Sequence, residues 1–162
     1  MNIDQHLSKK TFYEIMLKDR KKGKLPIEIL GDMFHEENKK ELADLANIRF
    51  AQGELYFHYQ DYEAAIFKWE SITNELGPWA RKNVGDAYFE LDLFSTAIET
   101  YKSIATDHNL LKTEIALKLF QIYVEEEKQE LATKFIKEAV ELNPDYPKVT
   151  KIARYFFEQN ND

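Results

Sequence analysis

The chain of 162 residues contains no cysteine, which removes disulfides, thiolate nucleophiles and cysteine-ligated metal sites. Its five glycines and four prolines stand mostly where helices should begin or end, so a strand-and-turn protein is not indicated. No apolar run approaches the roughly 18 residues of a membrane span, and the N-terminus lacks an apolar stretch behind a basic start. We therefore expect an all-helical, cytoplasmic protein without membrane insertion.

Catalytic motifs are also lacking. None of the serines stands in a Gly-x-Ser-x-Gly setting, and there is no Gly-rich phosphate loop. His35-Glu36-Glu37 resembles the start of a zincin helix, but no histidine follows four residues after His35, so two ligands cannot meet on one helix face. The run Glu125 to Glu127 is typical of a solvated helix end. We expect no enzyme activity, no metal and no cofactor.

The chain is acidic overall and contains enough apolar residues to fold. Hydrophobic residues make up 44% of the chain and the net charge is -7, which disfavours nucleic acid as a partner. The first 24 residues run against this trend, with about +4 net charge against about -11 for the rest. We expect this basic segment to fold against the acidic remainder, and an arm for lipid headgroups or RNA is the alternative.

Helical periodicity and capping residues predict a chain of helices joined by short connections, which makes neighbours antiparallel. Thr11-Phe12-Tyr13-Glu14 has the form of a capping box, and Pro26, Pro78 and Pro147 suit the first turn of a helix. The predicted helices span 12–22, 26–37, 39–59, 61–76, 78–91, 93–107, 112–126 and 129–142, and a last one begins near 147.

An internal repeat runs through the middle of the chain. Two runs share Gly-x-x-Tyr and then Ala-x-x-x-aromatic, with the glycines about 32 residues apart, and a third run has phenylalanine in place of the glycine. We expect the small residues to face each other, Gly53 against Ala65 and Gly85 against Ala97, while the aromatic residues fill the gaps between helix pairs. The repeated positions are Gly53, Tyr56, Ala65 and Trp69, then Gly85, Tyr88, Ala97 and Tyr101, then Phe120, Tyr123, Ala132 and Ile136.

These positions resemble the tetratricopeptide repeat, whose signature is Trp-x-x-Leu-Gly-x-x-Tyr, then Ala-x-x-x-Phe and a late proline. The likeness covers about residues 46–144, but the signature tryptophan is absent from all three copies. It implies a right-handed α-solenoid of antiparallel helix pairs. We expect an N-terminal helical hairpin in residues 1–44, packed on an array in residues 45–162 that has about three repeats and a terminal helix.

The resemblance also implies a concave groove, lined by the first helix of each pair, that holds a peptide or a partner helix. Asn83 and Lys118 match a clamp for a C-terminal carboxylate, but Phe50, Glu54 and Glu114 stand where other clamp residues are required, so apolar and neutral contacts are expected. Burial of Phe50, Phe57 and Phe89 against neighbouring helices is the alternative to an open aromatic wall. The implied binding residues are Asn47, Phe50, Glu54, Phe57, Trp79, Lys82, Asn83, Asp86, Phe89, Glu114, Lys118 and Gln121.

The repeat predicts a scaffold or adaptor that binds a protein or peptide. In the repeat register Asp162 corresponds to Asp61, so we hypothesise that the chain is a piece of a longer repeat protein. Ile152, Phe156 and Phe157 support this, since a capping helix should carry fewer apolar residues. Two alternatives remain: a regulatory or targeting module of a larger, possibly enzymatic protein, and a homodimer formed through the helix from Pro147 to Glu158.

Overall fold

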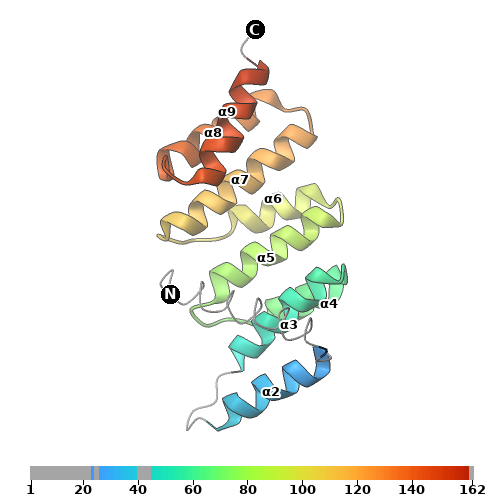
Figure 1. Ribbon diagram of the computed structural model, residues 1–162. Coiled ribbons are helices and arrows are strands. Elements are labelled where there is room, and N and C mark those ends of the chain that lie inside the picture. The colour runs from blue at the N-terminus through green and yellow to red at the C-terminus, as the bar shows by residue number, and fades with distance from the viewer. Residues whose placement is uncertain (1–22, 24–25, 40–44, 161–162) are drawn as a thin grey trace. The chain divides into compact units, whose positions relative to one another are not determined.

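A computed structural model describes residue 23 and residues 26–39 and 45–160, and Figure 1 shows the arrangement of its helices. All regular secondary structure in this part of the chain is helical, which confirms the expected all-α class. The predicted helix 12–22 lies outside the described residues. The described residues form α2 (Pro26–Asn38), α3 (Ala46–His58), α4 (Tyr62–Glu70), α5 (Gly77–Glu90), α6 (Phe94–Lys102), α7 (Asn109–Glu125), α8 (Gln129–Leu142) and α9 (Pro147–Asn160).

The chain divides into two compact units, residues 1–92 and residues 93–162, which we call unit 1 and unit 2. Unit 1 contains α2 to α5, and unit 2 contains α6 to α9. The boundary falls inside the second predicted repeat, between Gly85 and Ala97. The predicted packing of these two residues and the predicted division after residue 44 stay predictions.

In unit 1, α3 and α4 pack closely at Gly53. A Cβ added to Gly53 would lie 2.6 Å from Cδ1 of Trp69, inside the distance that atoms tolerate. The same indole donates a hydrogen bond of 3.1 Å from Nε1 to the backbone oxygen of Phe50. Glycine is therefore needed to admit the indole ring of Trp69, which is the nearest side chain to Gly53. The expected contact between Gly53 and Ala65 stays a prediction.

Outside this helix pair, α2 packs on α3 through Met33, which contacts Ala51 and Leu55. Phe34 of α2 is 47% exposed. Tyr56, expected to fill a gap between helix pairs, is 37% exposed. Apolar spacing assigns a residue to a helix face, but it does not say how far a neighbouring helix covers that face.

In unit 2, α7 and α8 form the longest helix pair, and α9 packs on α8. Tyr123 of α7 stacks on Phe135 of α8 with ring centroids 5.6 Å apart. Phe120, at the position of the repeat glycine, makes an edge contact with Phe156 of α9 at 5.1 Å. Ile136, which matches Trp69 in the repeat, is fully buried. The third copy is therefore packed with a large residue on its first helix and a smaller one on its second.

The turns after α3, α5 and α7 have the same backbone geometry. Gln60, Asp92 and Glu127 all have positive φ, at 64°, 60° and 57°. In the first and third turns, paired backbone hydrogen bonds close the helix end: residue 60 to 57 with 61 to 56, and residue 127 to 124 with 128 to 123. The next residues also share their torsions, with φ of -91°, -91° and -97°: Asp61, Leu93 and Lys128. The structure thus repeats locally in register with the sequence motif.

Helix ends account for most differences from the predicted boundaries. α4 ends at Glu70 and α6 at Lys102, several residues before the expected ends. The hydroxyls of Ser71 and Ser103 donate hydrogen bonds to carbonyls three residues earlier, at 2.8 and 2.7 Å. Serine side chains that bond to the local backbone compete with helix continuation. The prediction for α8, residues 129–142, is confirmed.

Two predicted helix starts also differ from the structure. α7 begins at Asn109 rather than near Lys112. Here the amide of Asn109 donates to the backbone oxygen of Leu142, and the hydroxyl of Thr113 donates to the Asn109 oxygen at 2.7 Å. These bonds hold the extra turn in place. Lys39, the predicted start of a long helix, lies in a turn, and residues 40–44 lie outside the described residues.

Candidate partner-binding site

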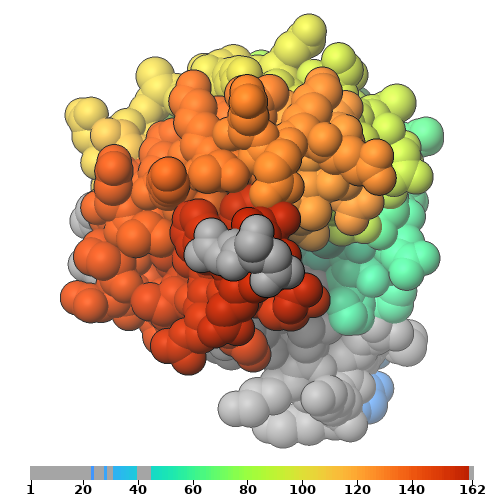
Figure 2. Space-filling view, turned by 90° about the horizontal axis from the view of Figure 1, so that it is seen from above, coloured from blue at the N-terminus to red at the C-terminus, as the bar shows by residue number. Residues whose placement is uncertain are grey.

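A groove of about 800 Å³ lies in unit 2 between the C-terminal halves of α7 and α9. We call it the α7–α9 groove. Figure 2 looks onto this end of unit 2, where the red surface of α9 lies beside the orange surface of α8. The walls of the α7–α9 groove are mainly apolar: Phe120, Tyr123, Val124, Ile152, Tyr155 and Phe156. Polar residues complete its lining: Glu127, Lys128, Gln129, Lys151, Gln159 and Asn160.

The apolar residues divide into a covered floor and an accessible edge. Phe120, Tyr123 and Phe156 are buried, each less than a tenth exposed. Val124 is 44% exposed and Tyr155 is 68% exposed. Large accessible aromatic and aliphatic side chains beside a packed apolar floor are the composition of a recognition site.

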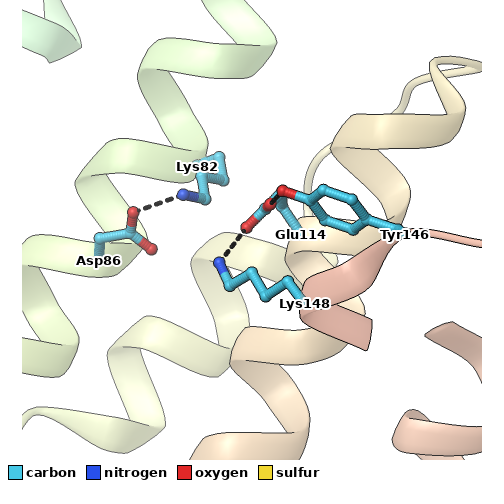
Figure 3. Close-up of polar contacts among 5 residues, drawn as sticks. All are labelled: Lys82, Asp86, Glu114, Tyr146 and Lys148. Atoms are coloured by element: carbon cyan, nitrogen blue, oxygen red, sulfur yellow. Dashed lines mark hydrogen bonds and ion pairs between the residues drawn. The ribbon is translucent and has the colours of Figure 1, made fainter. Parts of the chain in front are cut away.

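Two contacts fix α9 against α7 and so define the width of the groove. Near the start of α9, Glu114 of α7 accepts hydrogen bonds from the Tyr146 hydroxyl and the Lys148 ammonium, both at 2.9 Å (Figure 3). Further along, the Phe120 and Phe156 rings meet edge to face. Because a phenylalanine stands where the other copies have glycine, its ring occupies the space between α7 and α9 and forms part of the groove floor.

Tyr146 is adapted to this structural role. Burial raises its pKa from 10.0 to about 12, and the hydrogen bond and charge of Glu114 act in the same direction. The raised pKa keeps the hydroxyl protonated, and so a donor to the carboxylate, to higher pH than an ordinary tyrosine. Tyr146 does not line the groove, so this contact anchors α9 rather than meeting a partner.

The charged residues at the groove differ in how they are held. Lys128 lies 3.5 Å from a carboxylate oxygen of Glu126, and its ammonium is 5.9 Å from the centre of the Tyr123 ring. Lys151 makes no ion pair with any residue that the structure describes. The rim thus offers one partly engaged cation and one cation that is available to a partner.

The predicted aromatic wall of unit 1 is not open. Phe50 has no exposed surface and Trp79 is 2% exposed. Phe57 is half-buried, and its ring contacts those of Tyr62 at 5.2 Å and Trp69 at 5.9 Å. The expectation of exposed aromatic anchors is therefore wrong for Phe50 and Trp79, because neighbouring residues cover them. Phe89 is half-buried.

The predicted polar residues of unit 1 also have structural partners. Lys82 and Asp86 form an ion pair of 2.7 Å one helical turn apart, with side chains 14% and 12% exposed (Figure 3). This pairing reduces the surface that either residue offers to a partner. Asn47, Glu54 and Asn83 are half-buried.

In unit 2, three of the implied binding residues lie on α7 but do not line the α7–α9 groove: Glu114, Lys118 and Gln121. Glu114 is held by Tyr146 and Lys148, Lys118 is half-buried, and Gln121 is exposed. The sequence nevertheless carried two signals for the groove: the phenylalanine at the repeat glycine and the apolar residues of the last helix. Ile152 and Phe156 were recognised as too apolar for a capping helix, and both line the groove.

Other kinds of site find no support in the described part of the chain. These residues contain no group of three or more histidine, aspartate or glutamate side chains placed to hold a metal ion. No helix among them combines the length and the apolar character needed to cross a bilayer. No protein-family model matches the chain, and no curated protein matches its sequence.

Proposed function

We propose that this chain is a protein-interaction module of the tetratricopeptide type and that the α7–α9 groove binds an apolar peptide segment or helix of a partner protein. The observation that carries the proposal is the groove itself, about 800 Å³ with an apolar lining. Its size falls in the range of ligand sites, and the exposed Val124 and Tyr155 at its edge supply contact area that folding alone does not use.

The repeating turns support the solenoid part of this proposal. Gln60, Asp92 and Glu127 take the same left-handed conformation at matching positions of the repeat. A non-glycine residue in this conformation costs about 1 kcal/mol, so its recurrence points to one structural unit used three times. In a right-handed solenoid of antiparallel pairs, α7 and α9 are both first helices, and a groove between them lies on the side that such arrays use for binding.

A peptide-display selection on the intact chain tests this function. Peptides enriched on the wild-type protein are measured for binding to Val124→Asp, which places a charge at the accessible groove edge. Leu131→Asp is the matched control, since Leu131 is an exposed apolar residue of α8 that does not line the groove. We expect the affinity to fall at least about tenfold for Val124→Asp and to stay unchanged for Leu131→Asp.

Failure to enrich any peptide that distinguishes the two variants contradicts the proposal. Self-association through α9 is a second candidate, which the exposure of Tyr155 favours. It predicts that the apparent mass in light scattering rises with protein concentration and that Tyr155→Asp abolishes the rise. If the chain is monomeric at all concentrations, self-association is excluded and the groove binds a different protein.

A further inference from the structure

The last helix carries a basic edge beside the groove, in a chain whose net charge is -7. Lys148, Lys151 and Arg154 follow one another at intervals of three residues on α9, so they lie along one side of the helix. Lys148 pairs with Glu114 at 2.9 Å. Neither Lys151 nor Arg154 forms an ion pair with a residue that the structure describes. Two cations of this edge are thus available.

The two available cations flank the most exposed aromatic residue of the groove. Lys151 and Tyr155 both line the α7–α9 groove. The same two residues, together with Thr150, Arg154 and Glu158, also line a smaller depression of about 290 Å³ on the adjacent surface, where two cations stand against one carboxylate. The basic edge therefore continues directly from the apolar groove, and a partner that fills the groove passes beside both cations.

We propose that the partner segment is an acidic amphipathic helix. Its apolar stripe packs on Val124, Ile152 and Tyr155, and carboxylates on one flank of the stripe pair with Lys151 and Arg154. This inference rests on the proposed function and specifies the chemistry of its ligand. It combines apolar burial, which supplies affinity, with charge complementarity, which selects the partner and its direction.

The spacing of the cations favours a helix over an extended peptide. Lys151 and Arg154 are three residues apart on α9, a rise of about 4.5 Å along the axis. Carboxylates three or four residues apart on a partner helix are separated by a similar rise, about 4.5 to 6 Å. Alternate residues of a strand are about 6.6 Å apart and fit this interval less well.

Charge number argues against the other anionic partners. Surfaces that bind anionic lipids typically gather about four to eight basic residues, and the α9 edge offers two that are not already paired. Nucleic acid binding likewise needs many phosphate contacts, and the overall negative charge opposes them. A short acidic segment of a protein needs only two cations and an apolar surface.

The test uses two synthetic fluorescent helices of about 15 residues with the same leucine stripe. One carries glutamate along both flanks of the stripe, and the other carries lysine there. The wild-type chain is titrated into each labelled helix, and the fluorescence anisotropy of the helix reports binding. We expect the acidic helix to bind at least about tenfold more tightly than the basic helix, and added salt to reduce this preference.

Variants separate the charge from the groove. Lys151→Glu with Arg154→Glu should remove the preference for the acidic helix, while Lys112→Glu with Lys137→Glu, which changes the net charge equally at exposed positions outside the groove, should keep it. Val124→Asp should weaken binding of the acidic helix whether or not the Lys151→Glu and Arg154→Glu changes are also present. If Val124→Asp has no effect on any helix or selected peptide, the proposed function fails.

Other outcomes overturn only the inference. If groove-dependent binding is found with no preference between the two helices, the partner is not acidic and the function stands. If vesicles of phosphatidylserine and phosphatidylcholine retain the wild-type chain and not the Lys151→Glu and Arg154→Glu variant, the basic edge binds a membrane surface and the inference is wrong.

Discussion

Unit 1 and unit 2 carry residues of opposite size at matching positions of the repeat. In the α3–α4 pair a glycine on the first helix admits a buried tryptophan from the second, with Gly53 directly against the Trp69 ring. At the corresponding positions of the α7–α8 pair stand Phe120 and Ile136. In unit 2 the larger residue thus stands on the first helix, and its ring contacts Phe156 of α9.

The two large side chains differ in what they contact. In unit 1 the large aromatic side chain, Trp69, is 2% exposed and also lines a pocket of about 460 Å³ with Gly77 and Val84 of α5. In unit 2 the large side chain, Phe120, contacts Phe156 of the next helix and forms part of a groove wall. The residue at this position of the repeat thus decides which neighbour is packed: glycine admits Trp69 of the second helix, and phenylalanine reaches α9 and lines the α7–α9 groove.

The largest effect is expected from Phe120→Gly, which gives unit 2 the glycine of unit 1. The change removes a buried ring, worth about 3 to 5 kcal/mol, and places glycine inside a helix at a cost of about 1 kcal/mol. No tryptophan is present at Ile136 to fill the space. We expect urea unfolding to show a loss of about 4 kcal/mol or more, and a loss below about 1 kcal/mol would show that Phe120 is not a packing residue.

The converse change, Gly53→Ala, tests the close packing of α3 on α4. The added methyl overlaps an indole that is buried and hydrogen-bonded to Phe50, so we expect a loss of about 1 to 3 kcal/mol in free energy of unfolding. Gly31→Ala is the matched control, because a Cβ at Gly31 of α2 meets no atom within 4 Å. The control should gain up to about 1 kcal/mol from helix propensity. Equal gains at both sites would refute the close contact.

Tyr146→Phe tests the anchor of α9, which has no described equivalent in unit 1. Loss of the hydrogen bond to Glu114 should lower stability by about 1 kcal/mol at neutral pH. The raised pKa adds a pH dependence. Below 10.0 Tyr146 is protonated in both states, and between 10.0 and about 12 the unfolded chain loses its proton first, so stability falls as pH rises.

This alkaline loss should be smaller in Tyr146→Phe than in the wild type, and denaturant titrations across the window measure it. Identical slopes in the two proteins would mean that Tyr146 titrates normally in the folded chain.

The smallest effect concerns what the two units share, the left-handed turn. Gln60→Gly in unit 1 and Glu127→Gly in unit 2 should each stabilise the chain by about 0.5 to 1 kcal/mol, because glycine adopts positive φ without steric cost. Glu138→Gly, at an exposed helical position in α8, should instead cost about 1 kcal/mol. Thermal unfolding compares the three, and opposite effects at Gln60 and Glu127 would show that the turns differ.

Much of the helical layout could be predicted from the sequence because it depends on local pattern. The repeated spacing from Gly53 to Trp69 located the helices, and α8 matches its predicted bounds. The early ends of α4 and α6 could not be predicted in the same way, since a hydroxyl such as that of Ser71 can either face solvent or bond to the backbone.

The site was predicted less well because exposure depends on tertiary contacts. Helical spacing places Phe50 and Val124 on faces of their helices, but only the packed structure shows that the first is covered and the second is 44% exposed. The resemblance suggested a groove lined by first helices, and its residue offsets selected Glu114, whose carboxylate is used to hold Tyr146 and Lys148.

Amide chemical-shift mapping of the intact chain, titrated with a peptide enriched on it, shows which surface the peptide contacts. If the α7–α9 groove is that surface, the shifts concentrate at its apolar lining and at Lys151, and the residues of unit 1 stay unchanged. Shifts confined to unit 1, or a peptide that perturbs neither α7 nor α9, would contradict the proposed function.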